Sequence, residues 1–213
     1  RLQKMMAERL ASFLPNEMPN QVLEVGCGTG LFTKHLLIHS FKKIILNDIS
    51  IEMVNKLQEK YSLPHSSKIM MGDAESIDFQ SVDMVAANAV FQWFKSPEAT
   101  LKRLKLYINP SGRLIFSTFG PGTLFEIRHT ASIESPALLL PFNHWKKIII
   151  DTGLILTSAV TETHKTFFSS TLALLKNLQQ LGVAPTRMTR SADLRHLIKE
   201  YDKKFSTNQG VYA

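Results

Sequence analysis

The chain has 213 residues, of which 44% are hydrophobic, and it carries a formal net charge of +7 at pH 7. This length suits one globular domain with a sizeable core, and no apolar run reaches the roughly 18 residues that a membrane span requires. The single cysteine excludes an intrachain disulfide, so a reducing, cytoplasmic setting is expected. The scattered positive charge favours acidic partners, and no spacing of Cys, His and carboxylates predicts a metal site.

Apolar runs and amphipathic segments alternate through about residue 120, which predicts an α/β fold with a mostly parallel sheet covered by helices on both faces. A first helix is expected from about Leu2 to Phe13, before Pro15. The expected strands lie near 21–26, 43–48, 68–71, 82–88 and 113–119, and the helices between them lie near 30–39, 51–60 and 96–106.

A glycine-rich turn follows the first expected strand. Glu24 precedes three glycines, Gly26, Gly28 and Gly30, and Cys27 lies among them. Glycines let the backbone turn sharply and approach a ligand closely, because no Cβ stands in the way. The G-x-G-x-G spacing differs from the G-x-G-x-x-G dinucleotide fingerprint. We expect Cys27 to be a small packing residue rather than a nucleophile.

Polar residues end the next three expected strands. Asp48 closes the second strand, Asp73 follows the third, and Asn88 ends the fourth. Ligands of open parallel sheets bind outside the carboxyl ends of the strands, and a carboxylate at such a strand tip can accept hydrogen bonds from both ribose hydroxyls. Each acid alone is more often a helix cap or a loop acid. Their order behind the glycine turn predicts a cofactor site at this edge of the sheet.

The segment after Gly120 is less regular. We expect residues 1–120 to form a cofactor-binding core and residues 121–213 to add a sheet edge and a helical lid on the substrate side, within one domain of residues 1–213. The expected elements are helices over 124–132 and 141–150, an antiparallel strand over 155–168, and helices over 170–181 and 192–205.

With Glu24 before the glycines, this arrangement resembles motif I of the class I S-adenosylmethionine-dependent methyltransferases. The resemblance implies the Rossmann-like fold of that class, with S-adenosylmethionine as cofactor and no metal. It implies a cofactor site made of Glu24, Gly26, Cys27, Gly28, Gly30, Asp48, Ile49, Asp73, Ala74 and Asn88.

Three further segments narrow the resemblance to one family. Residues 88–94 (NAVFQWF) resemble the N-x-A-x-Q-W segment of the malonyl-acyl-carrier-protein O-methyltransferases, which begin pimelate assembly for biotin. The same residues lack the proline pair of amino-methylating DNA and protein-glutamine enzymes. Residues 116–127 match the family's F-x-T-x-x-x-G-(T/S)-L-x-E-(L/I) run, and residues 174–183 resemble a late helix end. The family's aromatic segment before the first helix and its apolar strand after the last helix are not evident between Arg1 and Ala213.

The resemblance implies methyl transfer to the free carboxylate of a malonyl thioester on an acyl-carrier protein. That carboxylate is ionised at neutral pH, so no general base is required. Arg128 is the candidate clamp for it, since guanidinium groups bind carboxylates bidentately. Trp93 and Phe94 are expected to line the methyl-transfer pocket, and Gln92 is expected either to hydrogen-bond the substrate or to hold the loop. We expect a monomer that engages the carrier protein and neither nucleic acid nor membrane.

Other functions stay open from the sequence alone. The chain could methylate another small carboxylate, act as a protein-arginine-modifying assembly factor of the same superfamily, or serve as a non-catalytic cofactor-binding scaffold. An RNA methyltransferase would account for the charge, but no appended RNA-binding module or aromatic-basic stacking platform is evident.

Overall fold

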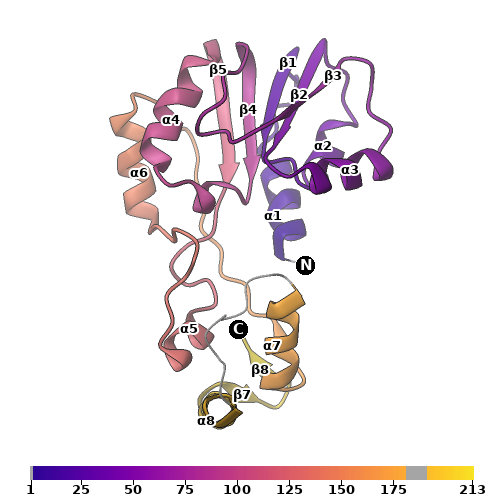
Figure 1. The fold of residues 1–213 in the computed structure, drawn as a ribbon. Coiled ribbons are helices and arrows are strands. Elements are labelled where there is room, and N and C mark those ends of the chain that lie inside the picture. Colours follow the sequence, from indigo (N-terminus) through magenta and orange to yellow (C-terminus); the bar gives the residue numbers. More distant parts are fainter. Residues whose placement is uncertain (1, 181–190) are drawn as a thin grey trace. The chain divides into compact units, whose positions relative to one another are not determined.

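The computed structural model describes residues 2–180 and 191–213, and it shows two compact units (Figure 1). The first unit comprises Arg1–Phe119 with Leu140–Ala159, and the second comprises Gly120–Leu139 with Val160–Ala213. The boundary expected near residue 120 therefore coincides with the end of the first stretch of unit 1, but the chain later returns to that unit.

Unit 1 is built on a parallel sheet of five strands in the order β3-β2-β1-β4-β5. The strands are β1 (Gln21–Val25), β2 (Lys43–Asp48), β3 (Ser67–Met71), β4 (Val82–Asn88) and β5 (Ile108–Ser117). The strand order reverses its direction between β1 and β4, and such a reversal creates a crevice at the carboxyl ends of the strands. The predicted parallel sheet is confirmed.

Helices cover both faces of this sheet, as Figure 1 shows. Leu23, Ile45 and Val85 point to one face and pack with the helices α4 and α6, whereas the alternate residues Val22 and Ile44 pack on the other face with α1, α2 and α3. The bounds are α1 (Leu2–Ala11), α2 (Thr33–Leu36), α3 (Ile51–Lys60), α4 (Pro97–Leu106) and α6 (Phe142–Asp151), and a 3-10 turn, η1 (Phe91–Trp93), follows β4. Strands buried on both faces are expected to be largely apolar, and the buried strands β1, β2 and β4 agree with this, whereas β3 and β5 at the sheet edges carry exposed polar residues.

Two expectations for the later part of the chain are wrong. Helix α6 was assigned to the lid side, but Trp145 lies in the core of unit 1, with its ring centroid 5.7 Å from that of Phe91 and 5.3 Å from that of Phe116. The antiparallel strand expected over 155–168 is reduced to β6 (Phe167–Phe168). Ile155 is 89% exposed, so the alternating pattern there has no neighbouring apolar face to bury it.

Unit 2 has its own small core and a three-stranded antiparallel sheet in the order β6-β8-β7. Tyr201 is buried and its hydroxyl donates to the carbonyl oxygen of Tyr212 at 2.6 Å. The elements are α5 (Phe125–Ala131), α7 (Thr171–Gln180), α8 (Ser191–Phe205), β7 (Ser206–Thr207) and β8 (Gly210–Tyr212). Strand β8 follows the last helix, where the sequence did not lead us to expect a strand. Residues 181–183 of the motif over 174–183 lie outside the described residues.

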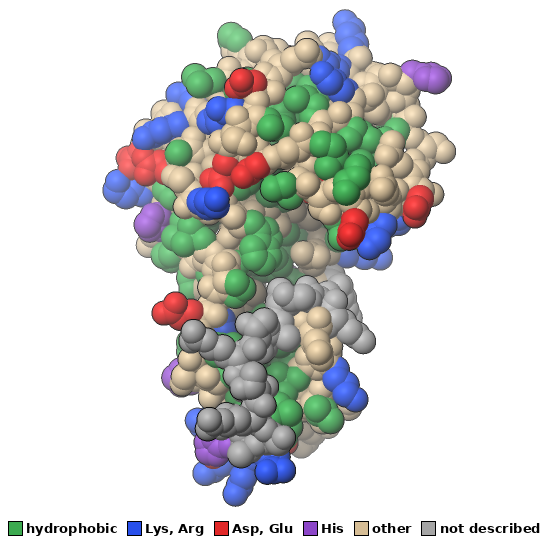
Figure 2. All heavy atoms as spheres, in the orientation of Figure 1, with side chains coloured by type: hydrophobic (Ala, Val, Ile, Leu, Met, Phe, Trp, Pro, Cys, Tyr) green, Lys and Arg blue, Asp and Glu red, His purple; other side chains and the backbone are tan. Residues whose placement is uncertain are grey.

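Acidic and basic side chains are interspersed on the face of unit 1 that Figure 2 shows, in keeping with the scattered charge of the sequence. Within the described ranges 2–180 and 191–213, no helix combines the length and the apolar character needed to cross a membrane.

Candidate functional site

The polar residues expected to bind the cofactor gather at the carboxyl edge of the unit 1 sheet. Glu24 lies in β1 and Asp48 ends β2, while Asp73 follows β3 and Asn88 ends β4. Since β1 lies between β2 and β4, the glycine turn that follows β1 occupies the position where the strand order reverses. This is the position at which open α/β sheets bind their ligands.

The three glycines of the turn have positive φ angles, +66° at Gly26, +53° at Gly28 and +83° at Gly30. A Cβ on Gly26 would lie 2.3 Å from a methyl carbon of Val90, and one on Gly30 would lie 2.6 Å from the Tyr61 ring. A Cβ on Gly28 would meet no atom of the described residues within 4 Å. Packing therefore requires Gly26 and Gly30, whereas the backbone at Gly28 faces open space that a ligand can enter.

Asp48 links this turn to the start of α3. Its Oδ2 accepts a hydrogen bond from the Gly28 amide at 2.7 Å, and its Oδ1 accepts one from the Ser50 amide at 2.9 Å. Each carboxylate oxygen retains a further lone pair, so the residue can also accept from two hydroxyls of a ribose. The adjacent Ile49 is 70% exposed, which gives the same edge an apolar surface.

Glu24 is fully buried beneath the turn. Its Oε2 has no hydrogen-bond partner among the described residues. Burial raises the pKa of Glu24 to about 8, and the neighbouring Asp48 carboxylate acts in the same direction. The carboxyl group is therefore largely protonated at neutral pH, and a cationic ligand group beside it would favour its ionised form.

Cys27 is 4% exposed and belongs to the core between the sheet and helices α1, α2 and α3. Burial raises the pKa of its thiol, and the Glu24 and Asp48 carboxyls raise it further. A thiol that stays protonated is neither a nucleophile nor a metal ligand. This agrees with the packing role expected of Cys27.

The turn after β3 places Asp73 and Ala74. The Asp73 Oδ1 accepts from the Glu75 amide at 2.9 Å, which leaves the carboxylate with further acceptor capacity. Ala74 is 6% exposed and packs in the core. The side chain of Asn47 fixes the turn from β2 by donating to the carbonyl oxygens of Met70 and Gly72 at 2.9 and 3.0 Å.

A polar network joins the ends of β4 and β5. The Asn88 Oδ1 accepts from the Ser117 hydroxyl at 2.8 Å. Gln92 is 1% exposed, and its amide donates to the Ala89 carbonyl oxygen at 2.6 Å and accepts from the Thr118 hydroxyl at 3.1 Å. Both ends of the Gln92 amide are thus engaged within the chain, which makes Gln92 a brace for the loop.

Trp93, the next residue, is 53% exposed and is the member of η1 that a substrate can touch. The bracing hydroxyls of Ser117 and Thr118 were not singled out from the sequence as site residues. In the sequence, this polar pair directly follows the apolar residues 114–116 of β5, and that position could have indicated their role.

Arg128 lies in unit 2, on α5. Its Nε donates to the Thr123 carbonyl oxygen at 3.0 Å, and its Nη2 donates to the Pro121 carbonyl oxygen at 2.5 Å. The guanidinium therefore holds the turn that precedes α5, and its remaining N–H groups are available to a carboxylate. The structure brings Gln92 and Trp93 together in unit 1, whereas it positions Arg128 within unit 2.

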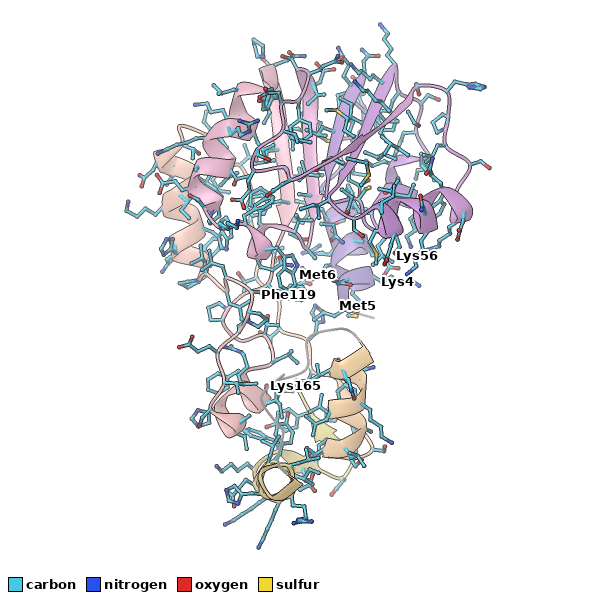
Figure 3. All side chains as sticks on the ribbon, viewed as in Figure 1. Lys4, Met5, Met6, Lys56, Phe119 and Lys165 are labelled. Carbon is cyan, nitrogen blue, oxygen red and sulfur yellow. The ribbon has the colours of Figure 1, made fainter. Side chains whose placement is uncertain are left out.

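Helix α1 adds side chains that were not assigned to the site from the sequence. It packs against β4 and β5, and the Asn88 Nδ2 donates to the Gln3 carbonyl oxygen at 3.4 Å. Figure 3 shows Met5 and Met6 on the side of unit 1 where the strands end, near Phe119, which follows β5. Apolar residues within an otherwise charged first helix are the signal that could have indicated this position.

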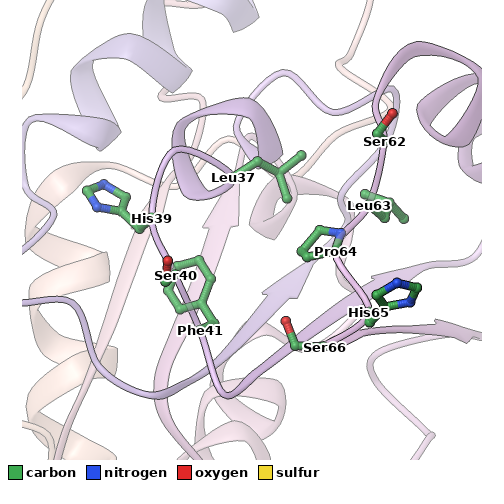
Figure 4. A pocket seen from close by; sticks show the side chains of 9 residues that line it. All are labelled: Leu37, His39, Ser40, Phe41, Ser62, Leu63, Pro64, His65 and Ser66. Atoms are coloured by element: carbon green, nitrogen blue, oxygen red, sulfur yellow. The ribbon is translucent and has the colours of Figure 1, made fainter.

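A surface pocket lined by residues between 37 and 41 and between 62 and 66 lies at the opposite edge of the sheet (Figure 4). These segments precede β2 and β3, so the pocket faces the amino ends of the strands. It contains none of the predicted site residues, and we do not assign the cofactor to it. Across the described residues, no group of three or more His, Cys, Asp or Glu side chains could hold a metal ion.

Comparison with known proteins identifies the family to which the chain belongs. The methyltransferase domain family matches residues 23–116. The malonyl-acyl-carrier-protein O-methyltransferase of Haemophilus ducreyi is 32% identical, with 90% of this chain and 76% of that protein covered. The enzyme of the same name from Calditerrivibrio nitroreducens is 31% identical, with 98% and 83% covered.

Solved structures share the fold at lower identity. An S-adenosylmethionine-dependent methyltransferase from Mesorhizobium loti superposes with a TM-score of 0.58 at 16% identity, over 84% of this chain and 92% of that one. The YcgJ protein from Bacillus subtilis superposes with a TM-score of 0.64 at 14% identity, over 93% and 83%. Because these two relatives exceed 30% identity over at least three quarters of each protein, the chain belongs to the malonyl-acyl-carrier-protein O-methyltransferase family of S-adenosylmethionine-dependent methyltransferases.

Proposed function

We propose that this chain transfers the methyl group of S-adenosylmethionine to the free carboxylate of malonyl-acyl-carrier protein, the step that begins pimelate formation for biotin. The observation that carries the proposal is the group of Glu24, Gly28 and Asp48, which we call the cradle, at the point where the strand order reverses. Relatives of this chain are named malonyl-acyl-carrier-protein O-methyltransferases. The net charge of +7 suits an acidic carrier protein as partner. We further propose that the chain acts as a cytoplasmic monomer.

The residues at the carboxyl edge fit this cofactor. Asp48 would hold the ribose hydroxyls, Asp73 the adenine amino group and the open backbone at Gly28 the methionine portion. The unpartnered Oε2 of Glu24 offers a buried acceptor beside them, and Ile49 an apolar contact for the base. When bound, the cofactor supplies an electrophilic methyl group on a sulfonium.

The chain contributes positioning rather than proton transfer. The malonyl carboxylate is already ionised at neutral pH and needs no base. Arg128 would bind it through the N–H groups that the turn carbonyls leave available. Within unit 1, the exposed face of Trp93 is the candidate contact for the methyl acceptor. Fixed orientation of two reactants can lower a barrier by on the order of 7–11 kcal/mol, provided that water is excluded and the reacting atoms are aligned.

Mass spectrometry of the carrier-bound product tests this function. After incubation with S-adenosylmethionine, we expect malonyl-acyl-carrier protein to gain one methyl group as an ester, whereas acetyl-acyl-carrier protein gains none because it has no free carboxylate. Methylation of a different small carboxylate, or cofactor binding without any transfer, would contradict the proposal and favour one of the alternatives left open by the sequence.

The Asp48→Ala substitution is expected to weaken cofactor binding on the order of 10- to 100-fold, because it removes a charged acceptor worth about 1.5–3 kcal/mol and frees the Gly28 amide. Isothermal titration with S-adenosylmethionine measures the change. Glu52→Ala is the matched control, since it removes an exposed carboxylate four residues later, from the first turn of α3. Equal affinity in the wild type and Asp48→Ala would remove Asp48 from the cofactor site.

Glu24 makes stability depend on pH in a defined direction. Its pKa is raised from 4.5 to about 8 in the folded protein, so the folded state keeps a proton that the unfolded chain releases. The stability that this carboxyl contributes is present below about pH 4.5 and is lost as the pH rises towards 8, by a few kcal/mol. Urea unfolding between pH 5 and 8 should show a steeper decline for the wild type than for Glu24→Gln. Parallel curves would show that Glu24 is ionised in the fold.

Replacement of Arg128 by alanine is expected to raise the KM for malonyl-acyl-carrier protein about tenfold or more, since a bidentate, charge-assisted contact is lost. Cofactor affinity should be unchanged because Arg128 lies outside unit 1. Arg128→Lys is the comparison, because lysine retains the positive charge but cannot bind the carboxylate through two parallel N–H groups, and this variant should have an intermediate KM. Normal steady-state kinetics for Arg128→Ala would rule out the clamp.

A further inference from the structure

The carboxylate of Glu75 accepts three hydrogen bonds from a different segment of unit 1. Its Oε2 accepts from the Lys95 amide at 2.9 Å, and its Oε1 accepts from the Ser96 amide and the Thr100 hydroxyl at 3.0 Å each. Lys95 and Ser96 immediately precede α4, and Thr100 lies in its first half. A single acidic side chain therefore holds the entry to a helix that begins 22 residues later in the chain.

Helix α4 has no cap of its own at this end. The side chain of its N-cap residue, Ser96, makes no capping hydrogen bond, and Pro97 occupies the first turn. Glu75 accepts from the two amides that immediately precede the first turn and places a negative charge at the positive end of the helix. Burial would raise the pKa of Glu75, but the two amides and the Thr100 hydroxyl outweigh it, so the pKa is lowered and the group is ionised at neutral pH.

The same residue belongs to the turn that carries the cofactor ligands. The Glu75 amide donates to Asp73 Oδ1 at 2.9 Å, and Ala74 lies between the two. Arg103, from the second half of α4, reinforces the attachment by donating to the Ser76 carbonyl oxygen at 2.8 Å and to Asp78 Oδ1 at 2.9 Å. The Asp73 turn and α4 are thus held together at both ends of the helix.

On its other side, Glu75 fixes the segment that carries Trp93. Lys95 follows Trp93 by two residues, and the intervening Phe94 is buried with its ring centroid 4.9 Å from that of Phe91. Gln92 braces the beginning of this segment and Glu75 binds its end. Trp93 is therefore an exposed side chain on a backbone that is held before and after it.

We propose that Glu75 is a positioning residue for methyl transfer, which holds the Asp73 turn on the cofactor side and the Trp93 segment on the acceptor side in fixed register. The inference rests on the proposed function, because it takes Trp93 to line the acceptor pocket. In-line transfer depends on the alignment of the two reactants, and a displacement of about 1 Å can cost on the order of 100-fold in rate.

Glu75→Gln tests the proposal with little change in shape. Glutamine keeps one acceptor oxygen but turns an NH₂ group towards a donor, so at least one of the three hydrogen bonds is lost. We expect kcat for malonyl-acyl-carrier protein, at saturating cofactor, to fall about tenfold while the dissociation constant of S-adenosylmethionine changes less than about threefold. Glu98→Gln is the matched control, because Glu98 lies in the first turn of the same helix and forms an ion pair with Lys102 on the exposed surface.

Tryptophan fluorescence gives a readout that general destabilisation would not move. The chain has two tryptophans, and Trp145 is 5% exposed, so acrylamide quenching of the folded protein reports mainly on Trp93. We expect the quenching constant to change in Glu75→Gln at a temperature where the protein is fully folded, and to stay at the wild-type value in Glu98→Gln.

The outcomes separate the inference from the function on which it rests. A lower melting temperature with unchanged kcat and unchanged quenching would make Glu75 a purely structural cap and would overturn the inference. Altered kcat and quenching together, with wild-type values in Glu98→Gln, would support it. If the wild type forms no methyl ester, the proposed function fails, and the quenching comparison still decides whether Glu75 fixes the Trp93 segment. Glu75→Asp replaces Glu75→Gln if the latter does not fold.

Discussion

The hydrogen bond from the Gly28 amide to Asp48 Oδ2, at 2.7 Å, is the contact on which the rest of the candidate site depends. It exists because β1 and β2 are neighbours in a register that places Val25 opposite Asn47, so that Asp48 comes level with the start of the glycine turn. The Cys27 amide extends this pairing to the Asn47 carbonyl oxygen at 2.8 Å. A register slip of one residue would reverse every side chain of the strand and remove the contact.

The two acids beneath the glycine turn have different hydrogen-bond partners. Two backbone amides donate to Asp48, whereas Oε2 of Glu24 has no partner among the described residues. Burial outweighs the opposing effect of Thr33 on the pKa of Glu24 and keeps its proton in place. The cradle can hold an additional negative charge only when a cation arrives, which suits a ligand that carries a sulfonium and an ammonium group.

The sequence was sufficient where local chemistry determines local structure. Apolar runs ending in Asp48 and Asn88 predicted strands β2 and β4, whose carboxyl ends lie at the same edge of the sheet. The glycines predicted the turn that follows β1, the strand between these two. The sequence was insufficient where the structure depends on which distant residues of the chain pack together. The periodicity of residues 141–150 predicts α6 but does not say that Trp145 packs on Phe91, and the alternation around Ile155 predicts a strand without supplying a neighbour. Whether Gln92 points to substrate or to its own loop depends on Thr118, 26 residues away.

The reaction explains why hydrogen bonds hold the segment around η1, which carries Trp93, in place. A carboxylate nucleophile needs no base, and in this site the Cys27 thiol is held protonated while the Gln92 amide is engaged at both ends. Rate enhancement must then come from geometry, which only a stiff scaffold can maintain. The hydroxyls of Ser117 and Thr118 and the carboxylate of Glu75 provide that stiffness around η1. Polar side chains that never touch the reactants can for this reason be as important to turnover as those that do.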